Sequence, residues 1–255
     1  FALSSYIASF NKIEKLITDL EIEEEDINLK ILDNYNKDII LENISFRYNT
    51  DFIFKDFNLK IPAKSNFLIK GKSGSGKSTL IDLIVKLQKP ESGKINIGNE
   101  NIQNLETKNL RKKIAYVSQE VLLFNDTIYE NIKSVKPDLS NEEFEKYSRL
   151  TISDQFINNL IDGKNFKVGE RGSNLSGGQR QRIGILRSIV NKPDIIILDE
   201  STNALDSQIS YNLLNNILNN FKESTIIFIA HEKINDDLFD ISLDLDNIKI
   251  SDEKK

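Results

Sequence analysis

The sequence contains no cysteine, no methionine and no tryptophan, and it has only one histidine and four prolines. Without cysteine the chain can form neither a disulfide framework nor a thiolate metal site. No run of about 18 apolar residues occurs, so no stretch of the sequence is long and apolar enough to cross a bilayer as a helix. The lack of an initiator methionine before Phe1 predicts that the chain is a piece of a longer protein.

Basic residues are also in the minority. The 255 residues carry a formal net charge of −5, with 39% hydrophobic and 29% charged residues, which is ordinary for a globular chain. Proteins that bind nucleic acid usually show a basic excess, so the acidic balance weighs against such a partner, and we expect no nucleic acid to bind.

The apolar residues near the N-terminus have a helical period. They recur every three or four positions from Leu3 to Leu20, which makes one stripe along a helix, and an acidic run follows at 21–26. We therefore predict a helix over 1–20 and a connector over 21–37.

From Ile39 onward the period changes to two. The alternation over 44–48 and 57–61 predicts antiparallel strands. Further strands are predicted at 66–70, 95–97 and 113–117, and a helix at 80–87.

The second half of the chain reads differently. Residues 121–190 are predicted to be mainly helical, with helices at 142–150 and 153–161. Two strongly apolar strands, 194–198 and 224–230, flank an amphipathic helix at 209–218. Continuous apolar strands between helices are typical of a parallel sheet that is covered on both faces.

The stretch GKSGSGKST at 71–79 follows an apolar strand and opens a helix. It fits the pattern G-x-x-x-x-G-K-[ST], in which glycines let backbone N–H groups turn towards a phosphate. The N-terminus of the following helix favours the same anion. Lys77 is expected to reach the β- and γ-phosphates and Ser78 to ligate Mg²⁺. The residues expected to hold ATP here are Gly71, Ser73, Gly74, Ser75, Gly76, Lys77, Ser78 and Thr79.

Two acids end the apolar strand at 194–198, and ligand sites in open α/β sheets lie at such carboxyl ends. Asp199 is expected to hold Mg²⁺, directly or through water. Glu200 is placed to take a proton from an attacking water as a general base. His231, the only histidine, ends another apolar run and is expected beside the same phosphates. A pair of surface acids and a structural histidine are the plainer alternatives.

The stretch LSGGQRQR at 175–182 strongly resembles the signature of the ATP-binding domain of ABC transporters. Its distance from the phosphate loop and from the acidic strand fits that family, and seven of the 11 glycines lie in these two motif regions. The resemblance implies an α/β fold with a RecA-like P-loop NTPase core, an antiparallel β subdomain and an inserted α-helical subdomain.

The same resemblance implies boundaries. Residues 1–37 are expected to form a stalk helix and linker from a preceding transmembrane domain. The ATP-binding core with its β subdomain is expected over 38–120 and 186–255, and the helical subdomain with the signature over 121–185.

Functional residues of the family map onto this chain. Tyr48 matches the aromatic residue that stacks on adenine, with an ordinary strand residue as the alternative. Gln119, in YVSQE, matches the glutamine that links Mg²⁺ to the membrane domain and helps to order the attacking water. Ser176, Gly178 and Gln179 match the signature that contacts the γ-phosphate bound by the other subunit; Ser176 is also a good helix N-cap.

Two further matches complete the site. Residues 201–206 resemble the loop that crosses the dimer interface, and His231 matches the switch histidine. The residues expected to act in hydrolysis are Lys77, Gln119, Glu200 and His231, and those expected to hold Mg²⁺ are Ser78, Gln119 and Asp199.

The segments at 123–132 and 168–172 resemble the exporter branch of the family, in which Glu170 lies near the coupling helices of the partner. There the ATPase follows the last membrane helix, so the stripe over 1–20 resembles the end of that helix; an unrelated capping helix or short coiled coil is the alternative. The expected partners are a second copy or sister nucleotide-binding domain and the transmembrane domain of the same transporter. The expected location is the cytoplasmic face of a bacterial inner membrane.

The sequence departs from the family at three places. Glu232 stands where many exporters have arginine, the segment 201–206 reads STNALD where ATSALD is commoner, and the chain ends without the usual extra helix and glycine-rich turn. Glu200 is intact, so we expect a site that hydrolyses ATP.

The predicted function is therefore an ATPase that powers export or flipping of a substrate across a membrane through ATP-driven dimerisation. Two alternatives remain: a soluble ABC-type ATPase that acts on nucleic acid or in translation, and the separate ATPase of an importer. The acidic balance and the lack of a long coiled-coil insertion weigh against the first, and the segment 168–172 weighs against the second.

Overall fold

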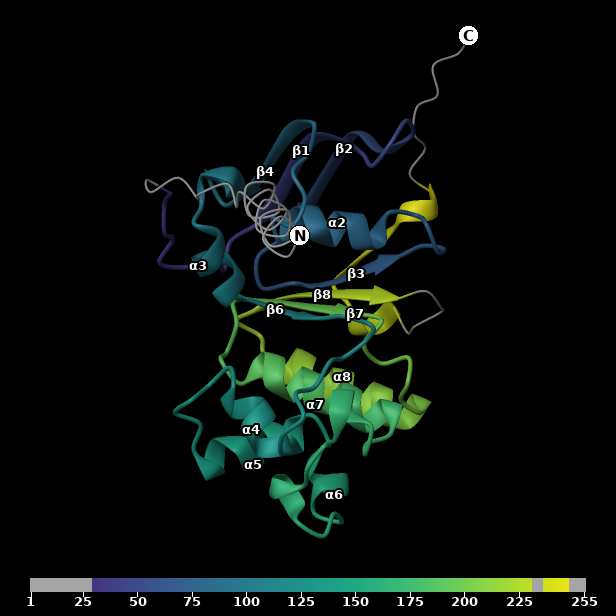
Figure 1. Ribbon diagram of the computed structural model, residues 1–255. Helices are drawn as coiled ribbons and strands as arrows, with labels where there is room; N and C mark the ends of the chain where they lie inside the picture. The colour runs from purple at the N-terminus through teal and green to yellow at the C-terminus, as the bar shows by residue number, and fades with distance from the viewer. Residues whose placement is uncertain (1–28, 231–235, 248–255) are drawn as a thin grey trace, which may run out of the picture.

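The computed structural model of the chain describes residues 29–230 and 236–247 (Figure 1). The helix predicted over 1–20 and the site residue His231 lie outside the described residues. Within them, no helix is long and apolar enough to cross a membrane. The described part contains a five-stranded and a four-stranded sheet with helices around them.

The five-stranded sheet is parallel throughout and has the order β6-β7-β8-β3-β9. Its strands are β3 (Asn66–Lys70), β6 (Ile114–Val117), β7 (Ile195–Asp199), β8 (Thr225–Ala230) and β9 (Ile241–Asp244). The predictions of strands at 66–70, 113–117, 194–198 and 224–230, and of a parallel sheet, are confirmed to within one residue at each end.

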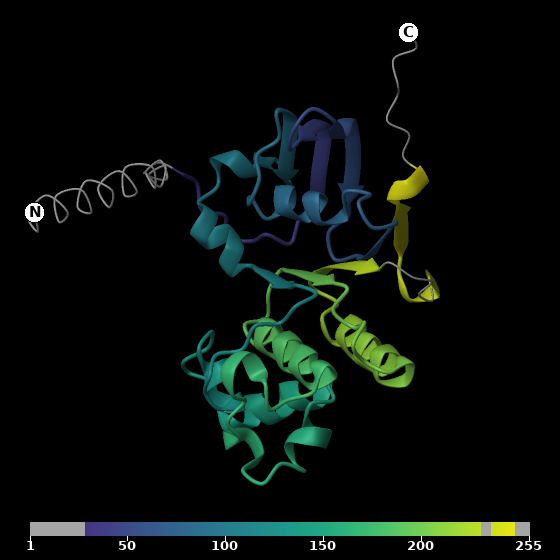
Figure 2. The ribbon, with the colours of Figure 1, turned by 45° about the vertical axis from the view of Figure 1, so that its right-hand side comes forward.

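Side chains of this sheet alternate between two cores, as the period of two requires. Along β7, Ile196 and Leu198 join the core beneath α7 (Gly177–Ile189) and α8 (Ser207–Asn220), and Ile195 and Ile197 join the core beneath α2 (Lys77–Ile84). Figures 1 and 2 show these helices on opposite faces of the sheet. Both faces are therefore buried, which explains why β7 and β8 are apolar without interruption.

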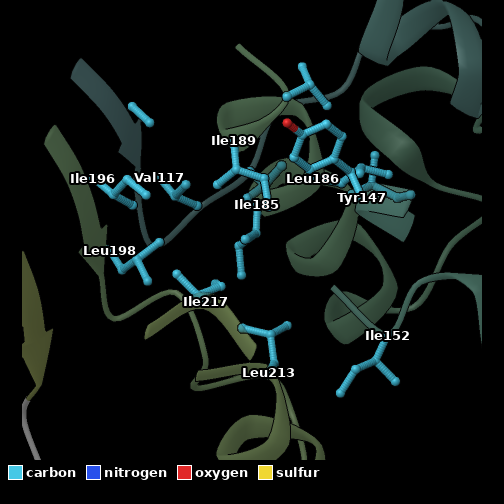
Figure 3. Close-up of a cluster of buried hydrophobic side chains, with 14 of the residues drawn as sticks. Val117, Tyr147, Ile152, Ile185, Leu186, Ile189, Ile196, Leu198, Leu213 and Ile217 are labelled. Atoms are coloured by element: carbon cyan, nitrogen blue, oxygen red, sulfur yellow. The ribbon is translucent and has the colours of Figure 1, made fainter. Parts of the chain in front are cut away.

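The first of these cores continues into the helical part of the chain. Figure 3 shows Ile185 and Ile189 of α7 between the strand residues Ile196 and Leu198 and the ring of Tyr147. Each fully buried isoleucine here contributes about 1.5–3 kcal/mol relative to an exposed one, so the helical part is held to the sheet by burial.

The four-stranded sheet is antiparallel, with the order β2-β1-β4-β5. Its strands are β1 (Ile39–Arg47), β2 (Phe52–Ile61), β4 (Ser92–Ile97) and β5 (Glu100–Asn101). It packs over α2 and shares a core with it, with Ile39, Ile61 and Ile97 fully buried. The prediction of antiparallel strands in this region is confirmed.

The remaining elements are short. The α-helices are α3 (Thr107–Lys112), α4 (Ile128–Lys133), α5 (Asn141–Leu150) and α6 (Asp154–Ile157). The 3-10 helices are η1 (Ile102–Asn104), η2 (Gly163–Asn165), η3 (Glu170–Gly172), η4 (Asp236–Leu238) and η5 (Leu245–Asn247).

Two helix predictions are wrong in extent. The helix predicted over 80–87 begins at Lys77 and ends at Ile84, because Lys86 takes a positive φ of 58° and the backbone turns away. The helix predicted over 153–161 ends at Ile157, and Ile161 is almost fully exposed. In both cases the prediction was too long because an apolar residue beyond the C-terminal end of the helix fits the helical spacing but is not buried.

Candidate nucleotide site

The register of the parallel sheet brings the predicted motifs together at the carboxyl ends of its central strands. Ile69 of β3 and Asp199 of β7 both pair with Ile229 of β8. The loop 71–79 therefore begins at the same level of the sheet as Glu200, at the carboxyl ends of two strands that flank β8. This is the edge at which open α/β sheets bind ligands.

The loop 71–79 wraps tightly at its start. Gly71, Gly74 and Gly76 all have positive φ, and Gly76 is the N-cap of α2. A Cβ on Gly76 would lie 2.9 Å from Cγ2 of Ile53, whereas a Cβ on Gly74 would meet nothing within 4 Å. The loop is thus packed on its inner side and open on its outer side, where an anion can approach the backbone.

Lys77 lies at the centre of the loop, with only 5% of its surface exposed. Its Nζ donates to the carbonyl oxygens of Gly71 at 2.6 Å and Lys72 at 2.8 Å. Burial lowers the pKa of the Lys77 ammonium, and the nearby carboxylates of Glu200, Asp246 and Asp199 oppose this shift. The ammonium is therefore held at the loop by fixed geometry and by surrounding negative charge.

The two acids predicted from the sequence are both buried, with 8% of Asp199 and 6% of Glu200 exposed. The hydroxyl of Tyr116 donates to Oδ2 of Asp199 at 3.1 Å. The side chain of Asn203 donates to Oε2 of Glu200 at 3.1 Å. Glu200 has a φ of 49°, a left-handed conformation that is rare for a residue with a side chain.

This arrangement fits a bound phosphate and a magnesium ion. The Ser75 hydroxyl oxygen is buried in the loop and has no hydrogen-bond partner among the described residues, which leaves a polar atom to be satisfied by a ligand. Ser78 is exposed at the first turn of α2, and Asp199 supplies a carboxylate at the same edge. Hydroxyl and carboxylate oxygens are the ligands that Mg²⁺ prefers.

Tyr48 and Gln119 are at the rim. Tyr48 follows β1 and is half exposed, and its interaction with Asp82 of α2 lowers the Asp82 pKa. That effect is outweighed by burial and by the charge of Asp199, so the pKa of Asp82 is raised overall. Gln119 is exposed two residues beyond β6, and its backbone carbonyl oxygen accepts from Nε2 of Gln181 at 3.3 Å.

The signature residues form the N-terminus of α7 (Gly177–Ile189). Ser176 is its N-cap: Oγ accepts from the Gln179 backbone N–H at 3.2 Å, and Oε1 of Gln179 accepts from the Ser176 N–H at 2.8 Å. A Cβ on Gly178 would lie 2.9 Å from the carbonyl oxygen of Ala204. Among the described residues no hydrogen bond joins this group to the loop 71–79, and Gly178 packs instead against the segment 201–206.

Sequence reasoning missed three residues of this region. Gln181 is buried and bridges two loops, because Oε1 also accepts from the Ala204 N–H at 3.2 Å. Asp246 accepts from the Lys72 N–H at 3.0 Å and so ties the C-terminal part of the sheet to the phosphate loop. Tyr116 contacts Asp199 directly. Gln181 and Tyr116 lie inside the motifs LSGGQRQR and YVSQE, so their place in these motifs was the sequence feature that could have identified them.

Comparisons with known proteins agree with this geometry. The family model described as ABC transporter matches residues 54–203. A putative export ATP-binding/permease protein of Rickettsia typhi is 40% identical over 215 residues, which is 83% of this chain and 37% of the relative. The lactococcin-G-processing and transport ATP-binding protein of Lactococcus lactis is 40% identical over 227 residues, which is 87% of this chain and 32% of the relative.

A solved structure described as a bacterial Atm1-family ABC exporter with ATP bound superimposes with a TM-score of 0.83. It is 32% identical, and the match covers 89% of this chain and 40% of that one. The chain thus spans about a third of the length of these relatives. Its fold is that of an ABC nucleotide-binding domain, with a RecA-like P-loop α/β core. Since the family model covers more than half of its residues, the chain belongs to the ABC transporter family.

Proposed function

We propose that this chain is the part of an exporter that binds and hydrolyses ATP and uses the energy to move a substrate across a membrane. The observation that carries the proposal is the sheet edge where Lys77, Asp199 and Glu200 meet the glycine-rich loop. The names of the relatives above describe export or transport proteins, which favours this function over action on nucleic acid.

The chain's own residues supply binding and proton transfer. The N–H groups of the loop 71–79 and the ammonium of Lys77 bind the phosphates of ATP. Ser78, Gln119 and Asp199 hold Mg²⁺, which when bound neutralises charge on the phosphate oxygens. The Glu200 carboxylate accepts the proton of the attacking water, and Asn203 fixes one of its oxygens. His231 and Tyr48 keep the roles implied by the family, beside the γ-phosphate and the adenine.

The signature at Ser176, Gly178 and Gln179 serves the nucleotide of a second nucleotide-binding domain. It lies at the N-terminus of a 13-residue helix, where the backbone favours an anion, but it makes no hydrogen bond to its own phosphate loop within the described residues. A second copy of this chain, or a sister domain, brings a phosphate to that helix. ATP therefore closes a dimer, and hydrolysis releases it.

A transmembrane domain of the same transporter is the other partner. A groove of about 550 Å³ runs beside β6 and is lined in part by Ser118, Leu122 and Arg187. Leu122 and the neighbouring Phe124 are both well exposed, with 59% and 63% of their surface accessible. An apolar rim next to Gln119 suits a helix end from the membrane domain, with Glu170 at the partner's coupling helices. The domain then lies on the cytoplasmic face of a bacterial inner membrane.

Sedimentation of the Glu200→Gln variant tests the proposal. Removing the base leaves ATP bound and uncleaved, so we expect a dimer with Mg-ATP and a monomer without it. Glu223→Gln is the matched control, because Glu223 is a highly exposed glutamate paired with Lys64 at the opposite edge of the sheet. A monomer of Glu200→Gln in both conditions, or the same ATP-dependent dimer in the control, would contradict the assignment of Glu200 as the base of an ATP-closed dimer.

A further inference from the structure

We propose that Tyr116 is a positioning residue that holds the Asp199 carboxylate in the orientation with which it binds Mg²⁺. The proposal rests on the metal-holding role proposed above for Asp199. It concerns a residue that neither the sequence motifs nor the family resemblance had singled out.

The geometry places Tyr116 on the strand next to Asp199. β6 and β7 are parallel neighbours, with Tyr116 opposite Ile197, two residues before Asp199. Ala115 and Val117 are buried towards α7, so Tyr116 projects from the other face of the sheet. From there its hydroxyl reaches Oδ2 of Asp199 at 3.1 Å, and 39% of the tyrosine stays exposed.

The carboxylate needs such a partner because another acid lies close to it. The negative charge of Asp199 is one of the causes that raise the pKa of Asp82. Like charges repel each other, and this repulsion disfavours the ionised carboxylate. A hydrogen bond to a charged acceptor opposes this, because it is stronger than one between neutral groups.

Groups that hold a metal ligand in place increase the affinity of the site for the metal by a measurable amount. Loss of such a partner typically weakens metal binding about 10–100-fold, although the partner never touches the ion. A tyrosine hydroxyl suits the role because it keeps its proton at neutral pH and can donate to an ionised carboxylate. The ring itself packs at the wall of the groove beside β6, so phenylalanine removes only the hydroxyl.

The test compares Tyr116→Phe with the unmodified chain by titrating Mg²⁺ against a fluorescent, non-hydrolysable ATP analogue. We expect the half-saturating Mg²⁺ concentration to rise about 10-fold, with binding of the analogue in EDTA unchanged. Tyr129→Phe is the matched control: Tyr129 belongs to α4, and its hydroxyl donates to the Leu139 carbonyl at 2.9 Å and not to a carboxylate. It should leave the Mg²⁺ dependence unchanged.

The double variant with Asp199→Asn separates a positioning role from an independent one. If Tyr116 acts through Asp199, adding Tyr116→Phe to Asp199→Asn causes no further loss of Mg²⁺ dependence. An unchanged Mg²⁺ requirement in Tyr116→Phe, or an additional loss in the double variant, overturns the proposal. Loss of binding in EDTA as well would assign Tyr116 a structural role and overturn it too. If the unmodified chain binds the analogue without any Mg²⁺ dependence, the proposed function of Asp199 itself fails, and this inference with it.

Discussion

Glu200 combines a proposed chemical role with a strained backbone. Its φ of 49° lies in the left-handed region, which costs an ordinary L-residue roughly 1–2 kcal/mol. Two backbone hydrogen bonds hold it there, from the Glu200 N–H to the Ile229 carbonyl at 3.1 Å and from the Asn203 N–H to the Glu200 carbonyl at 3.2 Å. Strain of this kind is found at functional sites, where the surroundings enforce it.

This strain predicts an inverted order of stability for two variants without the carboxylate. Glycine adopts positive φ without penalty, so Glu200→Gly should be more stable than Glu200→Ala by about 1 kcal/mol, although alanine is normally the better residue. Urea unfolding of both variants measures the difference. Both should lose hydrolysis. Equal stability, or a more stable alanine variant, would show that the strain at this position is negligible.

Asp82 is expected to destabilise the folded protein at neutral pH. Burial, followed by the charge of Asp199, raises its pKa above the ordinary 3.8, so the folded state binds more protons than the unfolded chain above that pH. Stability then falls as pH rises through this window and is unaffected below it, where both states are protonated. Asp82→Asn should therefore have a higher urea midpoint than the unmodified chain at pH 7, and the gap should close towards pH 4.

The exposed residue Asp51 supplies the control, since Asp51→Asn removes the same charge from the loop between β1 and β2, outside α2 and the parallel sheet. Its urea midpoint should differ little at either pH. A gap for Asp82→Asn that is the same at pH 4 and pH 7 would mean that packing, and not the ionised carboxylate, sets the difference.

The site residues that could be predicted are those that belong to a motif of consecutive positions in the sequence. Lys77 and Ser78 follow from the glycine pattern, and Asp199 and Glu200 follow from the end of an apolar strand. Tyr116 and Asp246 could not be predicted in the same way, because their roles come from register. Tyr116 reaches Asp199 across 83 positions, and Asp246 reaches the Lys72 N–H across 174.

At the scale of elements, two helices begin with the same device. Ser176 caps α7 in a capping box with Gln179, and Ser140 caps α5 in a capping box with Glu143. Both serines are exposed, so each cap is formed in water and should stabilise its helix to a similar degree. Only the cap of α7 belongs to the proposed signature.

The two caps predict a separation of stability from activity. Ser176→Ala and Ser140→Ala should each lower the free energy of unfolding by about 1 kcal/mol, because each removes a helix cap. Only Ser176→Ala should also slow ATP hydrolysis, by about tenfold or more, since it removes a donor to a charged phosphate. Urea unfolding and steady-state phosphate release measure the two effects. Similar rates for both variants would restrict Ser176 to capping.

The elements themselves were predictable where period and burial agree. β3 and α5 match the predicted ranges to within one residue, and α8 extends the predicted helix by two residues at each end, because their apolar residues really are buried. α2 and α6 ended early for the opposite reason, since Leu87 and Ile161 continue the spacing but remain exposed. The order of the five parallel strands could not be derived from the sequence, because pairing across the sheet depends on contacts between distant segments.

At the scale of the molecule, the sheet divides the proposed chemistry into two parts. The edge formed by β3, β7 and β8 gathers the phosphate loop and the acids, whereas the signature is carried away on α7, in the helical part on the other face of the sheet (Figure 2). In the proposed mechanism one copy has both halves of a site without joining them, and a second nucleotide-binding domain completes the site. If that domain is a second copy, the symmetry of the pair makes two such sites.

Mixing two inactive variants tests this division. Glu200→Gln lacks the base but keeps its signature, and Ser176→Arg lacks the signature but keeps its base. A mixed pair has one site with the intact base of the second variant and the intact signature of the first, so activity should reappear on mixing. Equal amounts should give about a quarter of the activity of the unmodified chain, since about half of the pairs are mixed and each has one complete site.

Mixing Glu200→Gln with a Glu200→Gln/Ser176→Arg double variant should restore nothing, because no copy then carries the base. If the first mixture also stays inactive while each variant still binds ATP, two copies of this chain do not complete each other's sites, and the pairing must be with a sister domain.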